Sequence, residues 1–187
     1  MGSIAEQQFA VVDVETSGLS LDTHHIIQVG VVTVDGTGHV VDRWSSLMAP
    51  RSRLFFRVGP THIHGITRKA LRGAPPARTV MLELARRLEG ARFVAHNAPF
   101  DLGFLRKAAA RTGVELPIDR PLCTLRLSRA LDPKRSLSHK LIDLCVRYHV
   151  ELVRPHDALA DAEATAAVLP HLLAAHGYTD TDQLPSV

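Results

Sequence analysis

Apolar residues are concentrated in four stretches of the chain that are rich in Val, Ile and Phe. Three of them lie close together, at residues 9–16, 26–34 and 40–47, and Asp35-Gly36 before the third is typical of hairpin turns. The fourth, residues 93–95, is short and apolar throughout, as in a buried strand. The pattern therefore predicts an antiparallel meander of three strands, followed later by a separate buried strand.

Other parts of the chain have apolar residues at helical spacing. One such stripe lies between Pro76 and Gly90, residues that are typical of a helix start and a helix end. Pro170 interrupts the Ala-rich last segment, and we expect it to kink or split that helix because proline costs about 3 kcal/mol in a helix interior. The other expected elements are a short helix ending near 71, helices from 97 onward, at 124–131, at 137–148 and from 156 to about 175, and a fifth strand at 117–122.

A meander followed by alternating helices and strands indicates an α/β fold, in which a mixed five-stranded sheet is flanked by helices. In such sheets, ligands bind at the carboxyl ends of the central strands. The 187 residues contain no internal repeat, low-complexity segment or linker, so we expect a single domain over 1–187. Its ordered core should run from about 8 to 176, and the short C-terminal tail should be frayed.

The net charge indicates which kind of partner the protein can bind, and the cysteines indicate whether its compartment is reducing or oxidising. Lys and Arg number 22 against 19 Asp and Glu, and this net charge of +3 is compatible with a partner that carries phosphates. Cys123 and Cys145 lie outside any CxxC pattern, so we expect reduced, buried thiols rather than a zinc site or a disulfide. Residues 1–8 are mostly polar, and no apolar run approaches membrane-spanning length. We therefore expect a cytoplasmic protein without a membrane partner.

Two carboxylates, Asp13 and Glu15, stand at the end of the first apolar run. Because side chains alternate along a strand, both point to one side of the sheet and Val14 points to the other. Like charges at the end of a buried strand repel each other, and no Lys or Arg is adjacent, so a divalent metal ion is the simplest partner. The alternative is that both acids lie in solvent and only solubilise the following turn.

A second polar motif, residues 96–101, follows the fourth predicted strand. Asn97 is a good helix N-cap and Pro99 suits the first turn, where the helix dipole favours the negative charge of Asp101. A well-capped helix start would explain this motif without any catalytic role. If the first and fourth strands are neighbours, however, Asp101 converges with the two acids of the first strand.

A third motif opens the last predicted helix. Asp157 can cap that helix, and Asp161 lies one turn further in, where its position is fixed. His156 lies just outside the helix and is free to swing. A lone histidine is usually just packed or exposed, but a histidine five residues before an acid, after two other acidic motifs, favours a functional role.

In this order and at these spacings, the three motifs resemble those of the DEDDh family of 3′–5′ exonucleases, which includes the proofreading ε subunit of bacterial DNA polymerase III. The resemblance covers nearly the whole chain and implies a ribonuclease H-like sheet. The sequence departs from the family pattern at Ser17, where Thr is commoner, and over 54–59, which leaves loop geometry and substrate preference open. The matching motifs are DVET at 13–16, HNAPFD at 96–101 and HDALAD at 156–161, with further matches at 64–67 and 138–141.

The resemblance implies a phosphodiesterase that uses two metal ions. Asp13, Glu15 and Asp161 would hold a first Mg²⁺, and Asp13 would bridge to a second. Asp101 would hold that second ion mainly through water, and Mn²⁺ should substitute for Mg²⁺. His156, whose unperturbed pKa is about 6.5, would be the general base.

The resemblance also implies the reaction and the positions that hold the substrate. The expected reaction is hydrolysis of the terminal phosphodiester at single-stranded or frayed DNA 3′ ends, which releases nucleoside 5′-monophosphates in proofreading or repair. Leu19 and Phe100 would contact bases through apolar side chains. The positions that would hold the last nucleotide are Thr16, Gly18, Leu19, His64 and Phe100.

Two alternatives to a DNA exonuclease stay open. An RNA-trimming 3′–5′ exoribonuclease would use the same chemistry, because the residues that sense a 2′-hydroxyl lie in loops. A catalytically silent exonuclease-fold binding module belongs to a different class, and the complete set of four acids and a histidine argues against it.

Partners other than the substrate are indicated more weakly. A DNA polymerase is a candidate partner. Residues 183–187 begin like the peptides that bind sliding clamps but lack their closing Leu-Phe pair, so no clamp binding through this tail is expected. Aromatic residues interleaved with Arg51, Arg53 and Arg57 can either contact nucleic acid or belong to a loop that packs on the core.

Overall fold

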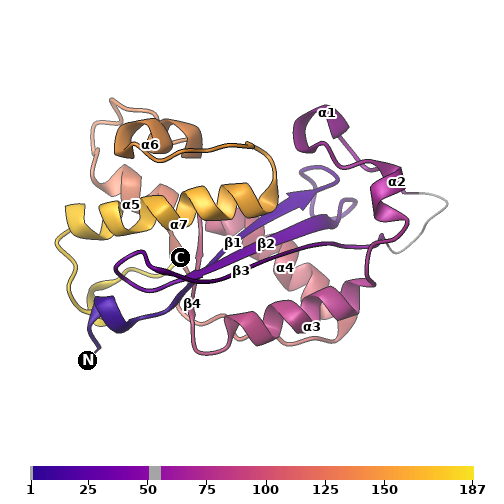
Figure 1. The fold of residues 1–187 in the computed structure, drawn as a ribbon, viewed down its shortest axis with the longest axis horizontal. Helices are drawn as coiled ribbons and strands as arrows, with labels where there is room; N and C mark the ends of the chain where they lie inside the picture. The colour runs from indigo at the N-terminus through magenta and orange to yellow at the C-terminus, as the bar shows by residue number, and fades with distance from the viewer. Residues whose placement is uncertain (1, 51–55) are drawn as a thin grey trace.

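The computed structural model describes residues 2–50 and 56–187, and its centre is a mixed five-stranded sheet of order β3-β2-β1-β4-β5. The first three strands form an antiparallel meander, while β4 and β5 are added in parallel beside β1, so the predicted α/β sheet is confirmed (Figure 1). The strands are β1 Phe9–Thr16, β2 Ile26–Val34, β3 Val40–Leu47, β4 Arg92–Ala95 and β5 Leu122–Cys123.

Helices cover both faces of the sheet, because alternate residues of the central strands face opposite layers. Val12 and Val14 of β1 belong to the core under α3 and α4, whereas Phe9 and Val11 belong to the core under α5, α6 and α7. In Figure 1, α7 crosses one side of the sheet and α3 lies on the other. The helices are α1 Thr61–His64, α2 Arg68–Leu71, α3 Ala77–Leu88, α4 Ala98–Thr112, α5 Thr124–Ala130, α6 Leu141–Tyr148 and α7 Ala158–Ala175, with 3₁₀ turns at Ile4–Glu6 and Thr181–Gln183.

Two predicted elements differ from the structure. The strand expected at 117–122 is wrong: only Leu122 and Cys123 pair with β4, since prolines at 117 and 121 have no N–H to donate to a ladder. The helix expected at 137–148 begins only at Leu141. The preceding loop is held by Asp132, whose carboxylate accepts a hydrogen bond from the Leu137 N–H at 2.8 Å.

Pro170 lies inside α7, which continues without a break to Ala175, so the expected split is wrong. Leu169 and Leu172 on either side of it are almost fully buried, in the core beneath α7. Burial of one such side chain contributes about 1.5–3 kcal/mol, so a few of them offset the cost of the proline. Figure 1 shows α7 as one continuous helix.

The C-terminal residues pack on the core, so the expected frayed tail is also wrong. The Arg92 guanidinium donates hydrogen bonds to the carbonyl oxygens of Leu184 and Pro185, and the Val187 N–H donates to the Pro121 carbonyl at 2.9 Å. Leu184 is 2% exposed. In this conformation its side chain is not available to a sliding clamp.

Two further sequence-based expectations concern the surface. Cys123 and Cys145 are buried free thiols, as expected. Phe56 is buried rather than exposed to nucleic acid, and the other part of the expected aromatic–arginine loop, 51–55, lies outside the described residues. Among the residues that the structure describes, no helix has both the length and the apolar character needed to cross a membrane.

Candidate active site at the carboxyl end of the central strands

Strand β1 carries two carboxylates to the α7 face of the sheet. Asp13 and Glu15 are partly accessible, whereas Val12, Val14 and Thr16 between and beside them are buried, as the alternation of side chains requires. Because β1 lies between β2 and β4, both acids stand at the centre of the sheet, next to the carboxyl end of β4.

Helix α4 brings the third acid to this point. Strand β4 is parallel to β1 and leads directly into α4, so Asp101 in the first turn of α4 lies beside the end of β1. Asp101 is 4% exposed. Asn97 occupies the N-cap position as predicted, but its side chain makes no capping hydrogen bond, so that expected contact is wrong.

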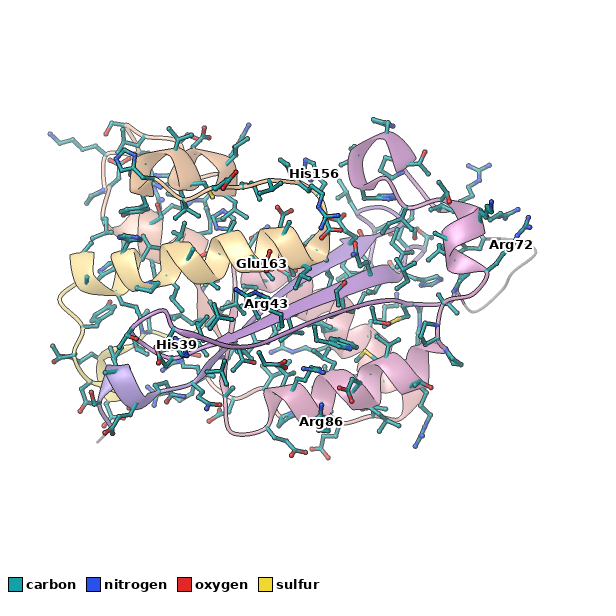
Figure 2. The ribbon with its side chains drawn as sticks, viewed as in Figure 1. His39, Arg43, Arg72, Arg86, His156 and Glu163 are labelled. Carbon is teal, nitrogen blue, oxygen red and sulfur yellow. The ribbon has the colours of Figure 1, made fainter. Side chains whose placement is uncertain are left out.

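Helix α7 brings the fourth acid and the histidine. The Asp157 side chain accepts a hydrogen bond from the Ala160 N–H at 3.2 Å and thereby caps the helix. His156 precedes this cap in a left-handed conformation (φ 65°), and its N–H donates to Asp161 Oδ2 at 3.0 Å. Figure 2 shows the exposed His156 side chain beside the N-terminal end of α7.

The side chains from β1 and α7 meet in one cluster. One ligand atom from each of Glu15, His156 and Asp161 lies within 4.8 Å of the other two. Asp13 and Asp101 lie close enough to influence each other, because Asp101 is the neighbouring charge that raises the pKa of Asp13 most. The structure therefore brings together all five residues that were predicted as catalytic.

All four acids are costly to ionise, mainly because they are buried, and neighbouring carboxylates add to the cost for Asp13 and Glu15. The pKa of Asp13 is raised, first by burial and then by the neighbouring carboxylates, and burial is also the main cause that raises the pKa of Glu15 to about 8. Burial raises the pKa of Asp101 to about 7, and it raises that of Asp161 as well. Among residues 2–50 and 56–187, none of the four forms an ion pair with Lys or Arg. Hard oxygen donors without a cationic partner fit a divalent metal ion.

Comparison with known proteins gives the family. Residues 10–169 match the family model RNase_T, described as Exonuclease. The chain belongs to this exonuclease family.

Relatives of the chain include large enzymes of DNA metabolism. It is 36% identical over 166 residues to the PolC-type DNA polymerase III of Halalkalibacterium halodurans, which covers 89% of this chain but only 11% of that polymerase. It is 33% identical over 172 residues to the 3′–5′ exonuclease DinG of Bacillus subtilis, covering 90% of this chain and 18% of DinG. The chain thus spans a small part of the curated relatives it matches.

Solved structures also match. Exonuclease X in complex with 5′ overhanging duplex DNA has a TM-score of 0.74 and 26% sequence identity, and the match covers 94% of this chain and 96% of that one. E. coli Exonuclease I in complex with a dT13 oligonucleotide shares the fold, with a TM-score of 0.78 and 19% identity over 92% of this chain and 42% of that chain. The exonuclease family that the resemblance of the three motifs implies is thereby confirmed.

Two residues that sequence reasoning missed set the position of α7 in this exonuclease fold. Gln28 lies opposite Glu15 in the β1–β2 ladder, and its side-chain amide contacts Asp157 Oδ2 and the Ala158 N–H, both at 3.4 Å. Gly30 lies opposite Asp13, and a Cβ there would come within 2.2 Å of the Ala158 carbonyl oxygen. The signal in the sequence is a Gln and a Gly inside the otherwise apolar run 26–34.

The turn after β1 carries three of the residues predicted to hold substrate. The buried Thr16 hydroxyl donates to the Gly18 carbonyl at 2.8 Å and so shapes the turn. Gly18 has φ 153°, and a Cβ there would come within 2.6 Å of the His24 ring. Leu19 is 82% exposed at the tip, free to contact a ligand.

The other two predicted substrate residues come from α1 and α4. His64 is buried, and its Nδ1 accepts a hydrogen bond from the Ile66 N–H at 3.0 Å. Burial is the main cause that lowers its pKa, and the charge of His156 contributes. The half-buried Phe100 ring lies 5.0 Å from that of Phe104.

The segment before α1 packs closely against the turn after β1, because a Cβ at Gly59 would come within 2.3 Å of the Ser17 carbonyl oxygen.

Proposed function

We propose that this chain is a divalent-metal-dependent 3′–5′ exonuclease that acts on DNA 3′ ends. The observation that carries the proposal is the convergence of Asp13, Glu15, Asp101 and Asp161 at one end of the sheet, with His156 at its edge. The similarity to Exonuclease X supports DNA as the substrate, because that protein was solved with 5′ overhanging duplex DNA, which has a recessed 3′ end.

The four acids would hold the metal. Asp13, Glu15 and Asp161 would hold a first Mg²⁺ or Mn²⁺, and Asp13 and Asp101 would hold a second. When bound, such ions polarise the scissile phosphate and stabilise the charge on the attacking and leaving oxygens. The raised pKa values of Glu15 and Asp101 support this assignment, because a carboxylate that is costly to ionise alone gains most from a bound cation.

His156 would act as the general base. It lies at the edge of the acid cluster, and its backbone N–H is anchored to Asp161, while its exposed ring can reach a water molecule. The ring would accept the proton of the water that attacks the terminal phosphodiester, and the product would be a nucleoside 5′-monophosphate. In this structure the histidine also lies within metal-ligand range of Glu15 and Asp161. The base role requires the ring to turn away from them.

The substrate end would be separated from its partner strand at the turn after β1. Exposed Leu19 offers an apolar surface that can hold an unstacked base without distinguishing its identity. Unpairing a terminal base costs a few kcal/mol, and less at a mismatch. The expected order of rates is therefore single strand, mispaired 3′ end and paired 3′ end, and Leu19→Ala should slow the paired end most.

Labelled oligonucleotides test the proposed function. Wild-type protein should shorten matched single-stranded DNA from its 3′ end with Mg²⁺ or Mn²⁺ and should be inactive in EDTA. RNA of the same sequence tests the alternative of an exoribonuclease, which would cut the RNA faster. Absence of cleavage of either polymer would overturn the proposal and leave a silent binding module.

The similarity to PolC-type polymerases supports a proofreading or repair role with a polymerase as partner, which a pull-down of the polymerase would test.

A further inference from the structure

A second concave site lies on the opposite face of the same sheet end. It is a cavity of about 760 Å³ between the start of β2, the segment after β3, the start of α3 and the second half of α4. Its volume lies in the range of about 300–1,000 Å³ that is typical of small-ligand sites. We call it the α4 pocket. The lining residues that bear on ligand binding are Ile26, Met48, Phe104, Lys107, Ala108 and Arg111.

One wall of the α4 pocket is cationic. Lys107 Nζ donates to the Leu21 carbonyl and lies 3.4 Å from the fully exposed carboxylate of Asp22. Arg111 Nη1 lies 2.6 Å from His25 Nδ1. Burial lowers the pKa of His25, and the positive charges of Arg111 and Lys107 lower it further. Because a guanidinium can only donate, Nδ1 of His25 accepts this hydrogen bond.

Arg111 is the cation of this wall that is open to a ligand, whereas Lys107 must exchange a weak, exposed ion pair with Asp22 for it. In the part of the chain that the structure describes, Arg111 has no carboxylate partner within ion-pair distance, and no acidic residue lines the pocket. Guanidinium and ammonium groups in this arrangement bind phosphate well. The wall therefore selects an anion.

The floor of the α4 pocket is apolar. Ile26, Met48 and Phe104 belong to the core under α3 and α4 and are almost fully covered, so the apolar surface that is open to a ligand comes from the smaller, partly exposed lining residues Ala49, Pro50, Ala77 and Ala108. An inorganic anion would leave this surface without a partner. A ligand with a flat, largely apolar body beside its negative charge would use both the wall and the floor.

The pocket and the candidate active site are built on adjoining strand positions. Ile26 pairs with Thr16, the residue after Glu15, so strand positions next to one another supply the two sites. The segment 18–25 then joins the exposed Leu19 to the wall of the pocket, and the His24 ring packs against Gly18.

We propose that the α4 pocket binds a nucleotide, with its phosphate on Lys107 and Arg111 and its base on the apolar floor. The inference rests on the proposed function. The nucleotide can come from the cut strand upstream of its end, from the opposite strand of a duplex end, or from a free nucleoside monophosphate. All three sources present the same chemistry, and different probes distinguish them.

Two variants of the whole chain separate charge from shape. The double variant Lys107→Gln/Arg111→Gln removes the phosphate contacts, and Ala108→Leu fills the cavity without changing charge. Arg86→Gln is the control, because Arg86 is a cation on α3 (labelled in Figure 2) that is paired with Glu83 and does not line the pocket. Binding is measured by fluorescence anisotropy in EDTA with a dT12 strand and with a duplex that has a recessed 3′ end, and by competition with thymidine 5′-monophosphate.

The double variant should bind at least one of these probes about 10-fold more weakly than Arg86→Gln. Because each phosphate contact adds about 0.7 to the slope of log affinity against log salt for single strands, its slope on dT12 should fall by about 1.4 if the cut strand is the source. Loss confined to the recessed duplex assigns the pocket to the opposite strand, and loss confined to the monophosphate assigns it to a free nucleotide. Ala108→Leu should weaken the same probe.

Equal affinities of the double variant and Arg86→Gln for all three probes would overturn the inference. An effect of the double variant without any effect of Ala108→Leu would also overturn it, because the cations would then act as a general basic surface. Failure of the proposed function looks different: wild type would cut no oligonucleotide with Mg²⁺, whatever the variants bind.

Discussion

The two faces of the sheet end carry opposite charge, although the same pair of strands contributes to both. On the α7 face, Asp13 and Glu15 of β1 meet Asp161 of α7. On the α4 face, Val14 and Ile26 pack into an apolar core, and the cations of the α4 pocket stand at its edge. The β-sheet keeps the cations away from the acids. Among the described residues, the acids on one face and Arg111 on the other therefore have no ion-pair partner, which suits the acidic face to metal ions and the basic face to phosphate.

The largest effect is expected when one carboxylate of the acidic face is removed. Asp13→Asn should reduce exonuclease turnover by about 10⁴-fold, the scale on which removal of one catalytic carboxylate acts in other hydrolases. Stabilisation by Mg²⁺, about 2.7 kcal/mol at 100-fold excess over the dissociation constant, should also largely disappear. Turnover and the Mg²⁺-dependent Tm measure the two effects. Asp119→Asn is the control, because it removes an exposed acid that does not belong to the cluster. If Mg²⁺ raises the Tm of Asp13→Asn as much as that of Asp119→Asn, the shared metal site is contradicted.

The second effect separates chemistry from metal binding on that face. His156→Ala should lose about 10²–10⁴-fold of turnover at neutral pH, as expected for a general base, and should keep its Mg²⁺-dependent rise in Tm. His39→Ala removes an exposed histidine at the far end of the sheet and should leave turnover unchanged (Figure 2). If His156→Ala instead loses the Mg²⁺ response, the histidine is a metal ligand and the base role is wrong.

The third effect tests how α7 is brought to the sheet. Gly30→Ala places a methyl group against the Ala158 backbone, so the start of α7 must move. We expect a loss of about 1–3 kcal/mol in the free energy of unfolding and about 10²-fold in turnover. Gly73→Ala is the matched control, because a Cβ there meets nothing within 4 Å. Affinity for dT12 in EDTA should stay unchanged if the α4 face is independent of this movement, and a loss would show that the two faces are coupled.

The smallest expected effect concerns the pH dependence of the metal-free protein. The pKa values of Glu15 and Asp101 are raised to about 8 and about 7, so these groups stabilise the fold while they are protonated. That contribution is complete below their unfolded pKa values and is lost as pH rises through the folded values. In EDTA the free energy of unfolding should fall by a few kcal/mol toward pH 8.5. Mg²⁺ should suppress the fall.

Another buried group, His96, limits the pH range in which the effect of the acids on stability can be measured by itself. Burial lowers the pKa of His96 to about 4, and its ring is held by Thr124 and the His139 carbonyl, each at 3.0 Å. A histidine kept neutral in the fold destabilises it as pH falls from 6.5 toward 4, by up to about 3 kcal/mol. Chemical denaturation between pH 6.5 and 8.5 therefore isolates the acids. A flat profile there in EDTA would contradict the raised pKa values of Glu15 and Asp101 and the burial that causes them.

Sequence reasoning succeeded where the determining contacts are local. The strands at 9–16, 26–34 and 40–47 agree with the structure, because their length and apolar content are set by neighbouring residues. It failed at Pro170 and at 117–122. At Pro170, distant packing outweighs a local preference, and at 117–122 two prolines remove donors that the ladder would need.

The sequence by itself predicted which groups form the candidate active site. Alternation along a strand puts Asp13 and Glu15 on one face, and the starts of two helices fix Asp101 and Asp161, because both rules act over a few residues. Only the tertiary structure decided how these groups meet. Gln28 and Gly30 contact the start of α7 about 130 residues further along the chain, and Lys107 and Arg111 acquire an apolar floor from β2 and the segment after β3. Contacts of that range depend on how whole elements pack, which no local periodicity encodes.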